Sequence, residues 1–249
     1  MGDLAYDFSG SRVLVTGGTS GLGLTIAQRF LRSGAHVIVT GRQTLTGSYD
    51  APLAAFEYLR LELTDHDSIA RVAEEVGPVD VLVNAAGAAL PRALDVHERE
   101  FVAHSIRLGL IGPGQLTRRL RYRLGESRQR GGGAVVNTQS LRQWFALSHG
   151  AAADTEMLDY TARLGAAWGR DGIRVNGVSS TVVTPRQSQL RVSIERHSGP
   201  LLTRTRQERT GTLQDVSSSV LFLASSGAAF VTGQTIVVNG GGAGARLGY

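Results

Sequence analysis

Two residue types are missing from the chain: it has no cysteine, and all 26 of its basic residues are arginine. Without cysteine the chain has no disulfide and no thiolate metal site, a composition that fits a reducing compartment. Without lysine it has no ε-amine for a Schiff base or for proton relay. We expect no metal site, and any enzymatic chemistry must do without both groups.

Long apolar segments are missing as well. No apolar run reaches the roughly 18 residues that a membrane-spanning helix needs. The opening MGDLAYDFSG has neither the basic nor the apolar region of a secretory signal, and Tyr6 stands where a myristoylation signal requires Ser or Thr. The net charge of +5 comes from scattered arginines without a nucleic-acid reader motif. We therefore expect a cytoplasmic protein with no membrane partner and no nucleic-acid partner.

Strand-like and helix-like patterns alternate along the 249 residues, and no Pro- or Ser-rich linker divides them, so we expect a single domain. Buried strands are expected at 11–16, 35–42, 55–63, 79–87, 133–140, 172–180 and 233–241. Helices are expected from the Gly-rich turn to Gly34 and at 66–76, 97–124, 152–169 and 214–225. This alternation predicts an α/β fold, a Rossmann-type doubly wound parallel sheet that binds ligands beyond the carboxyl ends of its strands. Residues 240–249 are expected to be a flexible tail.

A glycine-rich turn, TGGTSGLG, joins the first strand to the first helix. Its glycines, Gly17, Gly21 and Gly23, allow the backbone to approach a pyrophosphate seated on the helix N-terminus. A tight turn that binds no ligand has the same spacing, so this motif alone leaves two interpretations.

Four further motifs follow in order: LTD at 63–65, NAAG at 84–87, GIRVN at 172–176 and FLASSGAAFVTGQTIVVNGG at 222–241. Together with the TGxxxGxG spacing they resemble the classical short-chain dehydrogenase/reductase family over nearly the whole chain. The resemblance implies an oxidoreductase that binds a nicotinamide dinucleotide.

The resemblance also implies which residues contact the cofactor. Asp65 matches the aspartate that holds the adenine amine, and Asn84 matches the asparagine that stabilises the central strand beside the cofactor. Thr184 resembles the threonine that contacts the nicotinamide amide. The full expected set is Gly17, Ser20, Gly21, Leu22, Gly23, Arg42, Asp65, Asn84, Ala85, Gly87, Val183 and Thr184.

The cofactor type is indicated by the end of the second strand, VTGRQ. A dehydrogenase that prefers NAD has an Asp or Glu there, which binds both ribose hydroxyls and repels a 2′-phosphate. Here Gly41 leaves room, Arg42 offers a planar cation suited to phosphate, and Ser20 can add a hydroxyl. We expect NADPH/NADP+; a solvated surface arginine is the alternative.

The resemblance fails at the catalytic acid. Members of the family reduce a carbonyl with a Ser, a Tyr and a Lys, and Ser140 takes the place of the serine. Counting back from GIRVN puts the Tyr and Lys positions at Gly150 and Asp154, whereas counting forward from Ser140 puts them at Ala153 and Met157. Both alignments lack the pair.

Three other sources of the proton remain open. His149 titrates near neutrality and is, with Ser140, our candidate catalytic residue, although a water-exposed loop histidine is the alternative. Tyr160 lies two or three helical turns past the expected site and is more often a packing residue. A phenol of the substrate, peri to the ketone, has a pKa near ~10 and a high effective concentration.

These features resemble an atypical aromatic polyketide ketoreductase of the angucyclinone type. We therefore predict NADPH-dependent reduction of a polycyclic aromatic ketone or quinone in antibiotic biosynthesis, with substrate-assisted catalysis as one source of the proton. The alternatives are a catalytically inactive NADPH-binding sensor or scaffold and a redox-neutral cyclase or epimerase. Residues 186–209 fall where the family has its substrate lid.

The oligomeric state is indicated by an arginine-rich segment, TRRLRYR at 117–123. Relatives commonly form tetramers by pairing two long helices. Clustered arginines would repel each other across a two-fold axis unless acids matched them. We therefore expect a homo-oligomer, if one forms, to be smaller than the family tetramer.

Overall fold

The computed structural model describes residues 5–87, 103–104, 106–140, 150–180, 206–207, 209 and 211–241, with the backbone alone for 139–140 and 150–155. Three of the predicted site residues, His149, Val183 and Thr184, lie outside the described residues. The same holds for most of the predicted lid at 186–209 and for residues 242–249 of the predicted tail.

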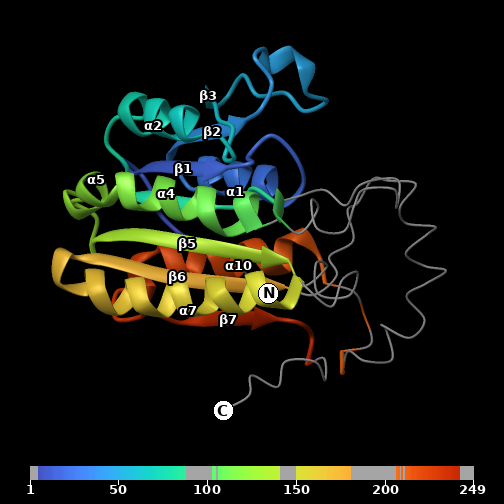
Figure 1. Ribbon diagram of the computed structural model, residues 1–249. Coiled ribbons are helices and arrows are strands. Elements are labelled where there is room, and N and C mark those ends of the chain that lie inside the picture. The colour runs from blue at the N-terminus through green and yellow to red at the C-terminus, as the bar shows by residue number, and fades with distance from the viewer. Residues whose placement is uncertain are drawn as a thin grey trace.

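Seven parallel strands form one sheet in the order β3-β2-β1-β4-β5-β6-β7 (Figure 1). The strands are β1 (Arg12–Thr16), β2 (His36–Gly41), β3 (Glu57–Arg60), β4 (Val81–Asn84), β5 (Gly133–Ser140), β6 (Ile173–Ser180) and β7 (Thr235–Val238). Each falls inside a segment predicted from the sequence. The strand order reverses between β1 and β4, which is where doubly wound sheets bind their ligands. The predicted Rossmann-type fold is confirmed.

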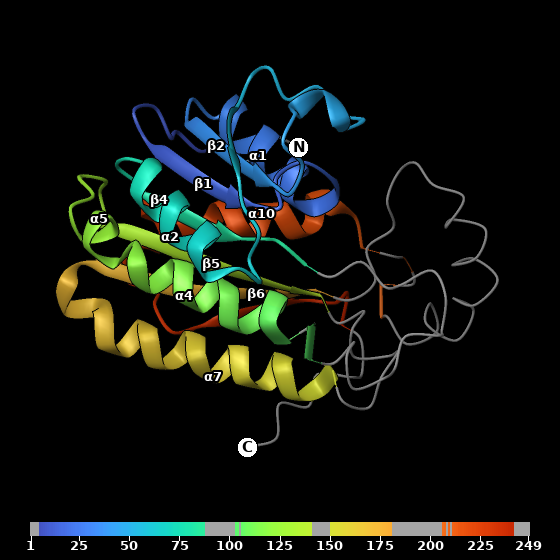
Figure 2. The ribbon, with the colours of Figure 1, turned by 45° about the horizontal axis from the view of Figure 1, so that its top comes forward.

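Helices cover both faces of the sheet (Figures 1 and 2). One face carries α1 (Gly21–Arg32) and α10 (Leu213–Ala224), and the other carries α2 (His66–Glu75), α4 (Gly112–Arg119), α5 (Arg121–Gly125) and α7 (Gly150–Trp168). Short 3₁₀ helices lie at η1 (Thr46–Ser48), η3 (Gly169–Asp171) and η4 (Ser226–Ala228), and a π-helical turn at η2 (Arg107–Ile111).

Two apolar clusters fill the spaces between the sheet and these helices. Ile26 and Phe30 of α1 pack with Val220 of α10 on one face, and Leu116 of α4 packs with Trp168 of α7 on the other. Parallel strands covered on both faces read as nearly continuous apolar runs, as the sequence of β1 and β4 does. The core therefore holds the carboxyl ends of the central strands in fixed positions.

The helical stretch predicted at 97–124 is helical in nearly all of its described part, but it is not one continuous α-helix. The π turn η2 precedes α4, and the helix breaks at Leu120, where α5 begins. Pro113 has no backbone N–H to donate, which weakens the helical ladder at this point. Gly112 lies so close to the carbonyl of Leu63 that a Cβ there would collide with it. The chain after β3 thus packs closely against the start of α4.

Two arginines close the C-terminal end of α2. The guanidinium of Arg12 donates to the carbonyls of Pro78 and Val76 at 3.0 and 3.2 Å. Arg123 donates to the carbonyl of Gly77 at 2.7 Å. Arg123 also donates to the carbonyl of Glu74, in the last turn of α2, at 3.2 Å. The last carbonyls of a helix lack intrahelical donors and carry partial negative charge, so both cations stabilise this end of the helix.

Arg174, in the GIRVN motif, is 5% exposed although it carries a charge. Burial lowers the pKa of its guanidinium. Its nitrogens donate to the carbonyls of Gly131, Leu223, Ala224, Ser225 and Ala228. A buried charge costs stability unless it is fully hydrogen-bonded, and these carbonyls meet that requirement at the C-terminal end of α10.

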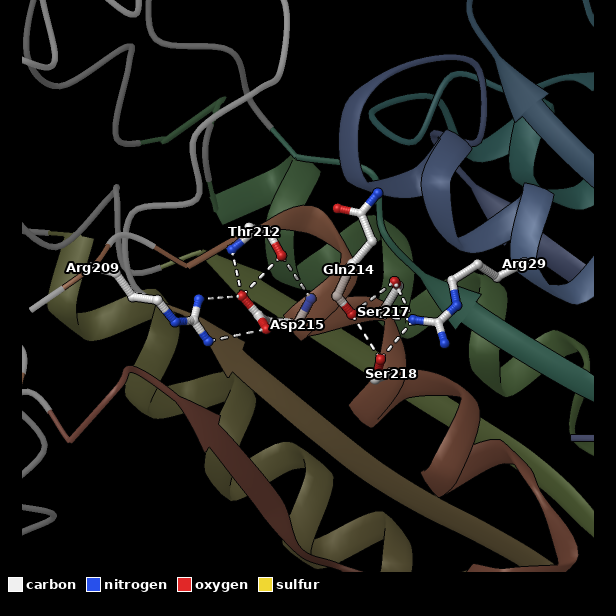
Figure 3. Close-up of polar contacts among 7 residues, drawn as sticks. All are labelled: Arg29, Arg209, Thr212, Gln214, Asp215, Ser217 and Ser218. Carbon is white, nitrogen blue, oxygen red and sulfur yellow. Dashed lines mark hydrogen bonds and ion pairs between the residues drawn. The ribbon is translucent and has the colours of Figure 1, made fainter. Parts of the chain in front are cut away.

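The N-terminus of α10 is capped by a hydrogen-bonded box. Thr212 Oγ1 accepts a hydrogen bond from the backbone N–H of Asp215, whose carboxylate in turn accepts one from the backbone N–H of Thr212 at 2.8 Å. Arg209 donates to the same carboxylate at 2.8 and 3.3 Å (Figure 3). This pair joins position 209 to the start of α10.

One arginine of α1 reaches the same helix. Arg29 Nη1 donates to the carbonyl of Gln214 and to the hydroxyls of Ser217 and Ser218, at 3.1, 3.0 and 2.7 Å (Figure 3). Because α1 begins at the Gly-rich turn, these bonds fix the helix that comes after the turn against α10.

Candidate functional site

The Gly-rich turn is packed too closely to accept side chains. Gly17 has a φ of 64°, and a Cβ there would lie 2.8 Å from the Cα of Ala86. A Cβ on Gly23 would collide with the carbonyl of Gly17. Glycine is therefore required at both positions, the first for its backbone conformation and both for close approach. The turn brings the start of α1 directly against the chain that follows β4.

The N-terminus of α1 fits an anionic group. Ser20 is its N-cap with extended backbone, yet its hydroxyl makes no capping hydrogen bond, and the first turn holds no acidic residue. Gly21 and Leu22 are in this first turn, where backbone N–H groups have no intrahelical acceptor. Free N–H groups and the positive end of the helix dipole together suit a phosphate.

Thr16, the last residue of β1, was not predicted from the sequence as part of the site. Its hydroxyl accepts hydrogen bonds from the backbone N–H groups of Ala85 and Ala86 at 3.0 and 3.2 Å. Ala85 and Gly87 were predicted to line the cofactor site, and Gly87 is exposed in the structure. The threonine thus holds the predicted NAAG segment beside the Gly-rich turn.

Asn84 ends β4 and joins a buried polar chain. Its Nδ2 donates to Asn137 Oδ1 on β5 and to Thr117 Oγ1 on α4, at 2.8 and 3.1 Å. Asn137 in turn donates to Thr161 Oγ1 on α7 at 2.9 Å. Asn84 Oδ1 is buried and accepts no hydrogen bond from any residue that the structure describes. These hydrogen bonds tie β4 and β5 to α4 and α7 beside the point where the strand order reverses. The contact of Asn84 with a cofactor stays a prediction.

Asp65 is the N-cap of α2, where its carboxylate accepts a hydrogen bond from the backbone N–H of Asp67 at 3.0 Å. The residue is exposed at the carboxyl end of the sheet. The cap uses one carboxylate oxygen, so the predicted bond to an adenine amine remains compatible with this geometry and remains a prediction.

The end of β2 differs from the sequence-based prediction. Gly41 does not leave open room, because a Cβ there would collide with the hydroxyl of Tyr49 and lie 2.8 Å from Thr19 Cγ2. Arg42 is exposed and follows the strand, as expected. Tyr49 lies in a loop without regular pairing, and no local motif linked it to Gly41. The position of the NAD-binding carboxylate is thus filled by another side chain.

The predicted catalytic edge is described only as backbone. Ser140 ends β5 in register with Ser180 of β6, and α7 begins at Gly150. The alternative Tyr and Lys positions, Gly150 to Met157, all lie in this first part of α7. Met157 is buried, at 4% exposure, so this side chain belongs to the core. Whether Ser140 acts on substrate stays a prediction.

Tyr160 faces α4. Its hydroxyl donates to the carbonyl of Gly114 at 3.2 Å, and the guanidinium of Arg118 lies 5.7 Å from its ring centroid. Burial raises the pKa of the Tyr160 phenol. A phenol engaged with α4 and disfavoured as an anion serves packing, which is the simpler of the two interpretations weighed from the sequence.

Within the described residues no group of three or more His, Cys, Asp or Glu side chains is arranged to hold a metal ion. The same part of the chain contains no helix long and apolar enough to cross a membrane.

Known proteins with similar sequences and structures share the fold described above. The family model described as enoyl-(acyl carrier protein) reductase matches residues 17–242. This match spans most of the chain, which belongs to the short-chain dehydrogenase/reductase family of oxidoreductases.

Several relatives align along nearly their full length. Gluconate 5-dehydrogenase of Gluconobacter oxydans (strain 621H) is 28% identical, over 95% of this chain and 96% of its own. Galactitol 2-dehydrogenase (L-tagatose-forming) of Cereibacter sphaeroides is 30% identical over the same shares. A gluconate 5-dehydrogenase from Burkholderia cenocepacia J2315, solved in complex with NADP and tartrate, is 26% identical with a TM-score of 0.79, covering 95% of this chain and 96% of that one.

Proposed function

We propose that the protein is an NADPH-dependent ketoreductase of an aromatic polyketide or antibiotic intermediate, reducing a ketone or quinone carbonyl of a polycyclic aromatic substrate. Membership of the family supports oxidoreductase chemistry, and the NADP complex of the Burkholderia cenocepacia relative supports the cofactor. The exposed Arg42 and the absence of a carboxylate at Gly41 support the phosphorylated form of that cofactor.

The observation that carries the proposal is the position of Tyr160. It is the only tyrosine in α7, and its hydroxyl is bonded to Gly114 of α4. The chain has no lysine at all. We infer that the residue pair which protonates the substrate in this family is missing here, so the proposed reduction uses another acid.

The reaction requires a hydride at the carbonyl carbon and a proton at its oxygen. NADPH supplies the hydride when it is bound at the Gly-rich turn. A phenol peri to the carbonyl supplies the proton through an existing intramolecular hydrogen bond, and the resulting phenolate regains a proton from water. A phenol has the same acidity as tyrosine, with a pKa near ~10, so it replaces the missing side chain chemically.

The protein's own contribution is then binding and orientation. The turn at Gly17 and Gly23, the N-terminus of α1 and Arg42 hold the dinucleotide. We assign the orientation of the carbonyl to Ser140, at the end of β5, and His149 is the alternative proton donor. Neither role requires a group with the lowered pKa of the usual tyrosine.

Matched ketone substrates test this proposal. NADPH oxidation is followed by absorbance with pairs of polycyclic aromatic ketones, one with a free peri-hydroxyl and the other with its methyl ether. Turnover confined to the free phenol supports substrate-assisted reduction. Turnover of both substrates, lost in His149→Ala, assigns the proton to the histidine instead. Tight NADPH binding without turnover of any ketone favours the inactive sensor or scaffold.

A further inference from the structure

A cluster around the end of β2 combines three residues that no sequence motif had linked: Tyr49, Tyr58 and Arg60. The hydroxyl of Tyr49 accepts a hydrogen bond from the backbone N–H of Gln43 at 2.9 Å and lies 3.2 Å from that of Tyr58. Tyr58 donates to the carbonyl of Gln43 at 2.5 Å, which leaves Tyr49 as the donor between the two phenols. Both tyrosines therefore brace the loop that follows Arg42.

Tyr49 is held where a side chain at position 41 would lie. A Cβ on Gly41 would collide with its hydroxyl and lie 2.8 Å from its Cζ. The hydrogen bonds to Gln43 and Tyr58 restrain the phenol, so it cannot turn aside without breaking them. A carboxylate at the end of β2, which would favour an unphosphorylated ribose, would thus have to displace the Tyr49 phenol and break these hydrogen bonds.

Arg60 places a second cation beside Arg42. Arg60, the last residue of β3, lies opposite Gly41 in the register of β2 and β3. Its Nε donates to the carbonyl of Arg42 at 3.1 Å. Burial raises the pKa of the Tyr58 phenol, and the positive charge of Arg60 opposes this shift. Both arginines are exposed.

The charges of these two arginines are unmatched in the described residues. Neither Arg42 nor Arg60 forms an ion pair with a carboxylate there, whereas the adjacent Arg71 pairs with Glu75 at 3.8 Å. Arginines at positions 42 and 60, joined by the bond from Arg60 Nε to the Arg42 carbonyl, add two positive charges to the end of β2 and β3. Positive charge attracts a dianion, and the planar donors of arginine suit phosphate oxygens.

We propose that Arg60 joins Arg42 in binding the 2′-phosphate of the cofactor ribose, and that Tyr49 excludes the carboxylate that NAD-specific binding requires. This rests on the proposed use of NADPH. It assigns the preference for a 2′-phosphate to Arg60 of β3 and to Tyr49 of the loop, in addition to Arg42, which follows β2.

The test measures nucleotide binding and needs no ketone. Isothermal titration of the full chain compares 2′,5′-ADP with 5′-ADP for the wild type, Arg60→Gln and Arg32→Gln. Arg32 is the matched control: it is an arginine on α1 whose Nε also donates to a backbone carbonyl, that of Gln28 at 3.3 Å. We expect Arg60→Gln to weaken 2′,5′-ADP about tenfold, leave 5′-ADP unchanged and lower the salt dependence of binding.

The outcomes separate this inference from the proposed function. A wild type that binds both nucleotides equally overturns the NADPH preference itself. A wild type that prefers 2′,5′-ADP, with Arg60→Gln behaving like Arg32→Gln, overturns only the role of Arg60.

A second set of variants tests Tyr49. Gly41→Asp alone is expected to weaken both nucleotides, because the new side chain meets the phenol. Gly41→Asp combined with Tyr49→Ala is expected to bind 5′-ADP better than 2′,5′-ADP, and Gly41→Asp with the exposed Tyr122→Ala is the matched control. A complete switch to 5′-ADP in Gly41→Asp alone would show that Tyr49 excludes nothing. Circular dichroism confirms that each variant is folded.

Discussion

The hydroxyl of Tyr160 and the carbonyl of Gly114 are 3.2 Å apart and join α7 to α4 by a hydrogen bond. Tyr160 is the only tyrosine in α7. The bond supports the interpretation of Tyr160 as a packing residue, and in the proposed reduction another group supplies the proton.

We expect Tyr160→Phe to lower the free energy of unfolding by about 1 kcal/mol, because the Gly114 carbonyl loses its donor. The kcat and KM for an accepted ketone should remain at the wild-type values. Urea denaturation and steady-state kinetics measure the two effects, with Tyr122→Phe, at 75% exposure, as the control. A loss of kcat without a loss of stability would assign the proton donor to Tyr160 after all.

Gly23→Ala should disrupt the cofactor turn. Its Cβ meets the carbonyl of Gly17, so the turn must shift, at a cost of about 1–3 kcal/mol in stability. Nucleotide binding should fall as well, measured by titration with NADPH. Gly169→Ala is the control, since no heavy atom lies within 4 Å of its Cβ position. Equal binding by the two variants would contradict the proposed approach of backbone to pyrophosphate.

Arg174→Met should be strongly destabilising. The substitution leaves several buried carbonyls at the end of α10 without donors, and we expect a loss of about 2–4 kcal/mol in the free energy of unfolding. Arg32→Met, on the exposed side of α1, should change stability little. Guanidinium denaturation compares the two, and similar midpoints would show that water replaces the guanidinium at no cost.

The Asp215 carboxylate predicts a pH dependence of stability. The hydrogen bond from Arg209 is the largest influence on it and, with the helix cap, lowers the pKa of Asp215 from 3.8 to about 2. A depressed pKa in the folded state stabilises the fold above pH 3.8, and this contribution is lost as the pH falls towards 2. Asp215→Asn should cost about 1 kcal/mol at pH 7 through the weakened cap, and less at pH values approaching 2. A gap that is independent of pH would assign the effect to packing.

The assembly is expected to be smaller than a tetramer. Arg118 and Arg121 lie over Tyr160 and Trp168 at 5.7 and 5.5 Å, and Arg121 also pairs with Asp171. Asp171 thus matches the charge of Arg121, whereas Arg118 is exposed and forms no ion pair among the described residues. A second copy paired through this surface would bring the unmatched charges together. Sedimentation equilibrium at low and high salt measures the mass, and a compact tetramer under both conditions would refute the expectation.

The sequence predicted the sheet well, because buried parallel strands and amphipathic helices leave local periodic patterns. It located the Gly-rich turn for the same reason, since the spacing of Gly17, Gly21 and Gly23 is a local signal. It failed where contacts depend on the path of a loop. The placement of Tyr49 against Gly41 results from tertiary packing that no local pattern encodes.

The two arginines that close the end of α2 have a further consequence. Arg12 is the first residue of β1, while Gly17 follows the last residue of β1. The bonds from Arg12 and Arg123 to the end of α2 therefore lie at the amino ends of the strands, and the Gly-rich turn lies at their carboxyl ends. Libraries that randomise residues after the carboxyl ends of the strands would leave these hydrogen bonds intact. Directed evolution of substrate range can therefore concentrate its mutations at the carboxyl ends of the strands, while the unchanged contacts at the amino ends keep the fold stable against destabilising changes.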